Sequence, residues 1–144
     1  MSSPAGAPAF VVDASVSAAW FLPHEATEQT EAMLHATATH EVWVPALWLL
    51  EVGNLLLSAQ RRKRITADKR RELAAAAAAL RIKVDHEPVA ITALDDIAAS
   101  HGLTVYDAAY LELALRRGLP LATLDDALIA AMAKAGVPAA LAGS

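Results

Sequence analysis

The spacing of hydrophobic and polar residues predicts strands that alternate with helices along the chain. Four short apolar runs have the composition of strands, at residues 9–13, 42–44, 81–84 and 119–123. Runs of this kind are typical of strands that are covered on both faces of a sheet. We expect a further short strand at residues 136–141. Helix-forming composition separates the strands, at residues 14–21, 25–39, 45–62, 66–80, 88–100, 107–117 and 125–135.

Residues at the ends of the predicted helices support these bounds. Pro45 stands where a helix start tolerates proline, and Thr66 is a suitable N-cap. Gly102 and Gly118 follow two of the helices and are good C-terminal stops. The alanine run at residues 74–79 favours helix, and we expect it to mark close packing against another helix.

The alternation of strands and helices indicates one α/β domain. We expect a mostly parallel central sheet of about four to five strands, with helices on both faces. A chain of 144 residues suits a single domain with one core, which we expect to extend over about residues 9–141. In open sheets of this kind, ligands bind beyond the carboxyl ends of the strands. That edge is therefore the place to look for functional residues.

Composition excludes several classes of protein. Hydrophobic residues make up 56% of the chain and charged residues 19%, which excludes a disordered chain. The longest charge-free apolar runs, at residues 42–50 and 73–80, are too short to span a membrane, and residues 1–9 do not resemble a signal peptide. We therefore expect a cytoplasmic protein. The absence of cysteine excludes disulfides, iron–sulfur clusters and thiolate zinc sites. The net charge of −4 argues against nucleic-acid binding through overall charge alone.

Four acidic residues interrupt apolar sequence near the predicted strand ends and helix starts. Asp13 ends the first strand, and Asp125 closely follows the fourth. Asp107 opens a helix, and Glu51 lies among leucines. Acids are rarely buried unless they are paired or bind a metal. Two carboxylates about 4 Å apart repel by roughly 4 kcal/mol at an effective dielectric near 20, so converging acids take up protons or bind a cation. With oxygen ligands alone, the expected cation is Mg²⁺ or Mn²⁺.

A non-catalytic alternative explains the same acids as helix caps. Asp13 and Asp125 stand where N-caps are expected, and Thr104–Asp107 and Thr123–Asp126 match capping boxes. Glu51 is then a solvated position on an amphipathic helix. On this interpretation the chain is an α/β interaction module that dimerises through its alanine-rich and tryptophan-bearing helices. Substitution of Asp107 distinguishes the helix-cap interpretation from the metal-site interpretation. Loss of a cap destabilises the fold, whereas loss of a crowded metal ligand does not.

The ordered set of acids resembles that of PIN-domain nucleases. An acid closes the first strand in Phe10–Ser15, and Glu51 lies inside an early helix. The segment Tyr106–Ala114 is very similar to the third-acid motif of that family, and Leu121–Asp125 is similar to the fourth. The order and spacing of these motifs cover about residues 9–141. A haloacid dehalogenase phosphatase would instead need a second acid two residues after the first, where this chain has serine.

The small size and single-domain layout look most like the VapC-type toxins of toxin–antitoxin pairs. That resemblance implies a PIN-like domain over residues 1–144 and an endoribonuclease that depends on Mg²⁺ or Mn²⁺ and cleaves RNA with metal-activated water. It also implies a homodimer and a cognate VapB-like antitoxin. In the segment similar to the fourth motif, the Thr-x-Asp spacing favours Asp125 over the adjacent Asp126 as the fourth acid. By motif, the catalytic and metal-binding quartet is Asp13, Glu51, Asp107 and Asp125, with the hydroxyls of Ser15 and Thr123 beside it.

Basic residues cluster in one run, which has three interpretations. The run contacts RNA phosphates, forms the solvated end of a helix, or contacts an acidic antitoxin segment. Its members are Arg61, Arg62, Lys63 and Arg64. We expect Arg116 and Arg117 to be simple charges at the end of a helix. Three tryptophans lie among aliphatic residues and are expected to make core or dimer contacts: Trp20, Trp43 and Trp48.

Overall fold

The structure, a computed structural model that describes residues 8–140, has the expected α/β architecture. Its strands pair in parallel in the order β3-β2-β1-β4. The strands are β1 (Ala9–Val12), β2 (Glu41–Pro45), β3 (Ile82–Asp85) and β4 (Leu121–Ala122). The helices are α1 (Ala14–Phe21), α2 (Glu28–Ala36), α3 (Leu47–Arg61), α4 (Ala67–Ala79), α5 (Ile91–His101), α6 (Val105–Arg117) and α7 (Asp126–Ala135).

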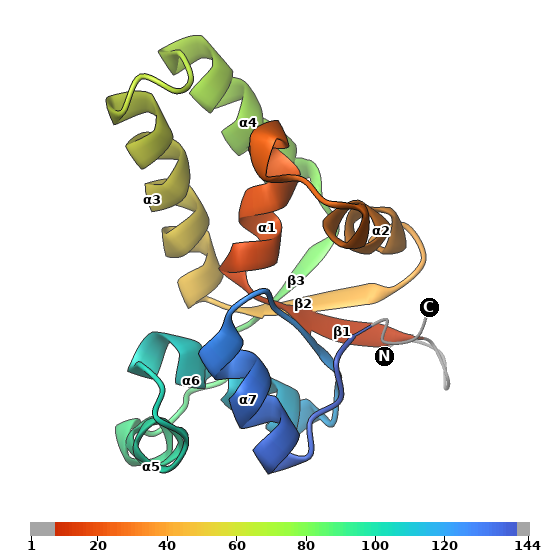
Figure 1. The fold of residues 1–144 in the computed structure, drawn as a ribbon, viewed down its shortest axis with the longest axis vertical. Coiled ribbons are helices and arrows are strands. Elements are labelled where there is room, and N and C mark those ends of the chain that lie inside the picture. Colours follow the sequence, from red (N-terminus) through yellow and green to blue (C-terminus); the bar gives the residue numbers. More distant parts are fainter. Residues whose placement is uncertain (1–7, 141–144) are drawn as a thin grey trace.

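Helices cover both faces of the sheet, as the apolar strand runs predict. Figure 1 shows α1 to α4 on one side of the strands and α5 to α7 on the other. The central strand β1 lies between β2 and β4, with Phe10 opposite Val42 and Val11 opposite Leu121. Because side chains on both faces of β1 are buried, its sequence is a continuous apolar run.

The bounds of α2 and α3 differ from the sequence prediction for reasons of local chemistry. Pro45 does not begin a helix; it is the last residue of β2, a position that tolerates proline because no further strand hydrogen bond is needed. Helix α3 begins at Leu47 without a side-chain cap. Residues 23–25 form a 3₁₀ turn instead of the start of α2. Helix α2 begins later because Thr27 and Thr30 form a capping box.

The alanine run packs against α3 along one edge only. Helix α4 lies against α3, and Leu73 and Ala77 contact the edge of the core, but none of its residues is fully buried. An apolar pocket of about 160 Å³ lies between the two helices. It is lined by Trp48, Leu49, Val52, Gly53, Leu56, Ala74, Ala77 and Ala78.

The remaining expectations have mixed outcomes. In place of the predicted strand at residues 136–141, the described part has an isolated bridge between Leu121 and Ala139, and residue 141 lies outside it. Trp48 is a buried core residue, whereas Trp20 and Trp43 are half-buried against the core. Within residues 8–140, no helix combines the length and the hydrophobicity that a membrane span requires.

Candidate active site

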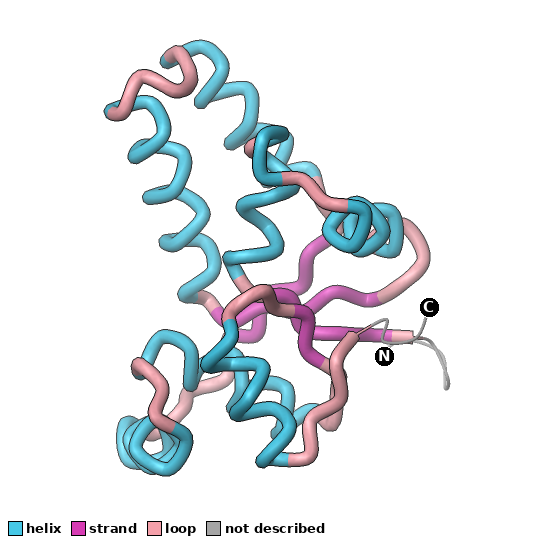
Figure 2. Tube along the Cα trace, in the orientation of Figure 1, coloured by secondary structure: helices cyan, strands magenta, loops and turns pink. Residues whose placement is uncertain are grey.

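The four predicted acids lie at or near the carboxyl edge of the sheet, on four different segments. Asp13 directly follows β1, and Asp125 follows β4 and precedes α7. Glu51 lies in the second turn of α3, which begins after β2, and Asp107 lies in the first turn of α6. Figures 1 and 2 show the starts of α1, α3, α6 and α7 gathered at this edge. The parallel topology therefore brings together acids that are distant in sequence.

Asp13 is buried, and donors surround its carboxylate. Its Oδ1 accepts hydrogen bonds from Ser15 N at 3.0 Å, Ser15 Oγ at 2.5 Å and Val16 N at 3.3 Å. Its Oδ2 accepts one from Thr123 Oγ1 at 2.5 Å. Burial raises the pKa of Asp13 above its ordinary value, and these donors oppose the increase. Asp13 thus caps α1, as the non-catalytic alternative predicts, and Oδ2 retains a free lone pair.

The two predicted hydroxyls connect Asp13 to the loop that carries Asp125. Ser15 Oγ accepts a hydrogen bond from Leu124 N at 3.0 Å. Thr123 Oγ1 accepts one from Asp125 N at 3.0 Å. The carboxylate of Asp125 in turn caps α7 by accepting from the backbone of residue 128 at 2.9 Å. Serine and threonine are suited to these positions because a hydroxyl donates and accepts at the same time.

Glu51 is half-buried and is held by a residue that the sequence analysis did not identify. The hydroxyl of Tyr110 donates to Glu51 Oε1 at 2.5 Å. Burial and the charges of Asp13 and Asp107 raise the pKa of Glu51, while this hydrogen bond opposes the increase. Burial and the contact with Glu51 also raise the pKa of Tyr110. A signal for Tyr110 exists in the sequence, because it lies three residues after Asp107 on the same face of a helix.

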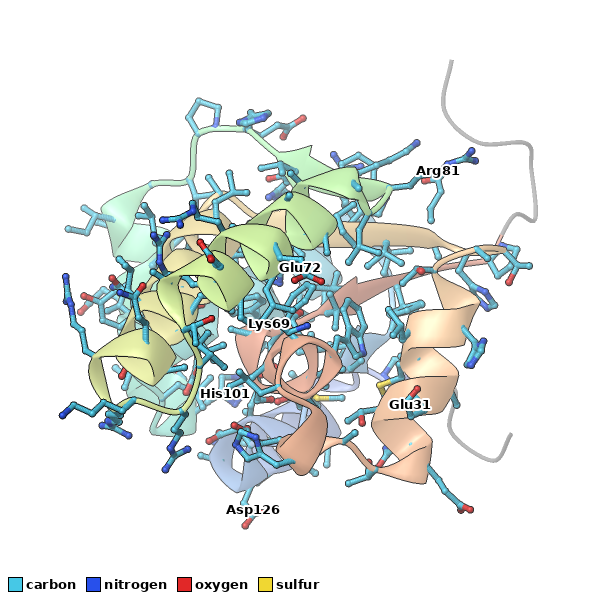
Figure 3. All side chains as sticks on the ribbon, turned by 90° about the horizontal axis from the view of Figure 1, so that it is seen from above. Glu31, Lys69, Glu72, Arg81, His101 and Asp126 are labelled. Atoms are coloured by element: carbon cyan, nitrogen blue, oxygen red, sulfur yellow. The ribbon has the colours of Figure 1, made fainter. Side chains whose placement is uncertain are left out.

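Asp107 does not cap a helix. Thr104 is the N-cap of α6, and its Oγ1 accepts a hydrogen bond from Asp107 N at 3.1 Å. Helix α6 therefore begins at Val105, two residues before the predicted start. Burial, followed by the charge of Asp125, raises the pKa of Asp107. Asp126 is exposed at the outer edge of the molecule, as Figure 3 shows, whereas Asp125 is the acid of this pair whose charge acts on Asp107.

The acids influence one another electrostatically but do not form a closed ligand shell. The charges of Asp13 and Asp107 act on Glu51, and that of Asp125 acts on Asp107. In the described part of the chain, no three His, Asp or Glu side chains are close enough to surround a single ion. The chemistry of the donor set nevertheless suits a hard divalent cation, because it consists of carboxylate oxygens that form no ion pair with a lysine, arginine or histidine among residues 8–140.

Arg116 and Arg117 are not simple helix-end charges, and this prediction was wrong. Arg116 donates to both oxygens of Asp85, at 3.2 and 2.7 Å, and Arg117 donates to Asp85 Oδ1 at 2.9 Å. Arg116 also forms an ion pair with Glu112, and Arg117 lies over the ring of Trp43 at 3.6 Å. Hydrogen bonds from the two arginines lower the pKa of Asp85. These hydrogen bonds and ion pairs link the end of α6 to the end of β3.

The basic run lies far from the acids. Arg61 is the last residue of α3, and the run that follows it turns toward α4. Figure 1 shows this turn at the end of the α3–α4 hairpin that is remote from the sheet. Glu51 lies ten residues earlier, roughly 15 Å along the helix axis at 1.5 Å per residue. Contact between this run and RNA stays a prediction, and it concerns RNA long enough to cover that distance.

The raised pKa values of Asp13, Glu51 and Asp107 predict that the metal-free protein is more stable at mildly acidic pH. A carboxyl whose pKa is higher in the folded state destabilises the fold above that pKa, and the penalty disappears below the unfolded pKa. Between about pH 7 and pH 5, above the ordinary range of carboxyl pKa values, we therefore expect the thermal midpoint of unfolding to rise as the pH falls. Calorimetry without divalent ions measures this midpoint. Asp107→Asn should show a smaller rise, and an identical pH dependence would contradict the assignment.

Comparisons with known proteins show which proteins this chain resembles. A family model described as PIN domain matches residues 10–135. Among curated proteins, the chain is similar to Ribonuclease VapC3 of Pyrobaculum aerophilum, with 38% identity over 123 residues, 82% of this chain and 90% of that protein. Among solved structures, it is similar to the crystal structure of PAE2754 from Pyrobaculum aerophilum. That match has a TM-score of 0.64 and 27% identity, and it covers 87% of this chain and 80% of the other.

Proposed function

This chain belongs to the PIN-domain family, and on that basis we propose that it is an endoribonuclease that depends on Mg²⁺ or Mn²⁺. The observation that carries the proposal is the gathering of four acids, from four segments, at the edge of the sheet where such folds bind ligands. The similar protein from Pyrobaculum aerophilum is named Ribonuclease VapC3, which supports RNA as the substrate. The hydrolysed bond is the phosphodiester.

The side chains of this site have distinct tasks in the proposed reaction. A bound divalent ion supplies activated water at neutral pH and stabilises negative charge on a phosphate. Ser15 and Thr123 hold the Asp13 carboxylate by donating to its two oxygens, and they keep the Asp125 loop beside it. The residues that would hold the ion are Asp13, Glu51, Asp107 and Asp125.

The non-catalytic alternative has one observation in its favour. Asp13 and Asp125 do cap α1 and α7, as an interaction module with capping acids requires. Capping does not account for Glu51 or Asp107, because neither caps a helix and each has a pKa raised by burial and by other acids of the site. Two carboxyls with raised pKa values lower the stability of the fold at neutral pH, so a stabilising role does not explain their presence. We therefore favour the nuclease.

We further propose that the protein acts as the toxin of a toxin–antitoxin pair, as a homodimer that a VapB-like antitoxin inhibits. The name of the similar protein, VapC3, supports this assignment. The open apolar pocket between α3 and α4 offers a surface for a partner chain, and Leu49 and Leu50 at the start of α3 are exposed at 52% and 69%. Apolar side chains exposed in this way are typical of interaction surfaces when they form a patch.

Metal titration followed by product analysis tests the proposed function. We expect the purified protein, free of antitoxin, to bind Mn²⁺ saturably in calorimetry and to cleave RNA only when Mg²⁺ or Mn²⁺ is present. Attack by water leaves 5′-phosphate and 3′-hydroxyl ends, which mass spectrometry of the fragments identifies. Products that carry a 2′,3′-cyclic phosphate would contradict the mechanism, because they indicate attack by the ribose hydroxyl. Absence of Mn²⁺ binding by the folded protein would contradict metal dependence.

A further inference from the structure

The hydroxyl of Tyr110 contacts one of the four acids and is influenced by the charges of two others. Tyr110 lies on α6 and is only 1% exposed, and it donates to Glu51 Oε1 on α3 at 2.5 Å. The charges of Asp13 and Asp107 also act on this hydroxyl. One neutral donor thus contacts one carboxylate and is influenced by the charges of two others.

The position of Tyr110 on α6 connects Glu51 to a second acid. Asp107 precedes Tyr110 by three residues, so both side chains project from the same face of the helix. A hydrogen bond from Tyr110 therefore fixes Glu51 relative to the segment that carries Asp107. No lysine, arginine or histidine among residues 8–140 forms an ion pair with Glu51, which leaves the phenol as the group that holds this carboxylate.

The start of α3 is anchored independently, so the role of Tyr110 concerns the side chain of Glu51 more than its backbone. Trp48 lies one turn before Glu51 and donates from Nε1 to the buried Ser17 Oγ of α1 at 2.8 Å. This contact holds the first turn of α3 in place without Tyr110. The contact of Trp48 does not reach the Glu51 carboxylate, which is half-buried, is influenced by the charges of Asp13 and Asp107, and accepts its hydrogen bond from Tyr110.

We infer that Tyr110 is a positioning residue that holds one oxygen of Glu51 and leaves the other as a ligand for the divalent ion. The inference rests on the proposed metal-dependent function. Groups that hydrogen-bond to metal ligands orient them, and their loss typically lowers metal affinity by about 10- to 100-fold. The aromatic ring of Tyr110 packs in the core as well, so only removal of the hydroxyl isolates the positioning role.

Tyr110→Phe removes the hydroxyl and keeps the ring. We expect this variant to bind Mn²⁺ at least about tenfold more weakly than the wild type in titration calorimetry, from the usual effect of losing such a partner. The matched control is Tyr106→Phe, which removes a phenol from the same helix at a side chain that is 63% exposed. We expect that control to bind Mn²⁺ with wild-type affinity. Thermal unfolding without metal reports separately on stability.

The outcomes separate this inference from the proposed function. Saturable binding by the wild type with equal affinity in Tyr110→Phe would overturn the positioning role and leave the metal site intact. No binding by the folded wild type would overturn both. A lower unfolding temperature with unchanged Mn²⁺ affinity would assign Tyr110 a purely structural role. If Tyr110→Phe is destabilised, both proteins are titrated with Mn²⁺ at a lower temperature at which their unfolding curves show them folded, because only the loss of the hydroxyl, with the ring kept, isolates the positioning role.

Discussion

Asp107→Asn is expected to lower RNA cleavage by at least roughly 10³-fold, because loss of a metal ligand removes several kcal/mol of transition-state stabilisation. We expect the free energy of unfolding of the metal-free variant to equal or exceed that of the wild type. Asp107 does not cap α6, and both burial and the charge of Asp125 raise its pKa. A neutral amide of the same shape relieves that penalty. Loss of a favourable charge near the helix start opposes the gain by about 0.3–1 kcal/mol.

Cleavage rate, Mn²⁺ affinity and chemical denaturation of the same samples measure these effects. Asp126→Asn is the matched control, since it removes an exposed acid from the first turn of α7 and should retain activity and metal binding. An active Asp107→Asn variant would remove Asp107 from the catalytic set. A variant that keeps its activity and loses more than about 1 kcal/mol of stability would show that the acid serves the helix, as caps do.

The fold was predictable from sequence because its core strands are simple. The central strand β1 is buried on both faces, so four consecutive apolar residues identify it. Helix starts were less predictable, because they depend on which hydroxyl captures a backbone N–H. Thr27 shortens α2, and Thr104 lengthens α6. Pro45 suits both a strand end and a helix start, and only its pairing opposite Asp85 distinguishes them.

The sequence indicates the four acids and the hydroxyls of Ser15 and Thr123 beside Asp13, whereas it does not indicate the partner of Glu51. An acid in apolar sequence is conspicuous, and its position relative to a strand places it at the carboxyl edge. The partner of Glu51 is Tyr110, 59 residues away, on a helix whose rotation the sequence does not specify. Asp85 was missed for a similar reason. The predicted strand ended one residue earlier, and the arginines that bind Asp85 are more than 30 residues away.

Capping does not exclude a role in the acidic site for Asp13 and Asp125. Each carboxylate caps a helix, and its charge also acts on another of the four acids. The N-terminus of a helix carries partial positive charge, which stabilises an acid that has no cationic side chain nearby. Capping therefore helps the metal-free fold to tolerate a cluster of negative charges. Glu51 lies in the second turn of its helix, and Asp107 lies near a helix start without capping it, so substitution of either acid is the sharper test of function.

Asp85→Asn tests an acid whose pKa is lowered by arginines, in contrast to the raised pKa values of the active-site acids, and it lies at the other end of α6. Its carboxylate is 4% exposed and accepts hydrogen bonds from Arg116 and Arg117. Removal of one partner of a fully buried ion pair costs about 3–5 kcal/mol. The two arginine side chains are 28% and 30% exposed, and Arg116 keeps its contact with Glu112. We therefore expect a smaller loss, about 2 kcal/mol of unfolding free energy, with saturable Mn²⁺ binding retained.

The pH dependence of Asp85 should run opposite to that of the active-site acids. The pKa of Asp85 is lowered in the folded state, so its contribution to stability is complete above the ordinary aspartate pKa and disappears as the pH falls through the folded value. The free energy of unfolding of the wild type should fall steeply below about pH 4, and that of Asp85→Asn should fall less over that range. Asp68→Asn is the control, because its pair with Arg71 is exposed and should contribute less than about 1 kcal/mol. Equal losses in the two variants would show that the Asp85 network adds no more stability than a surface pair.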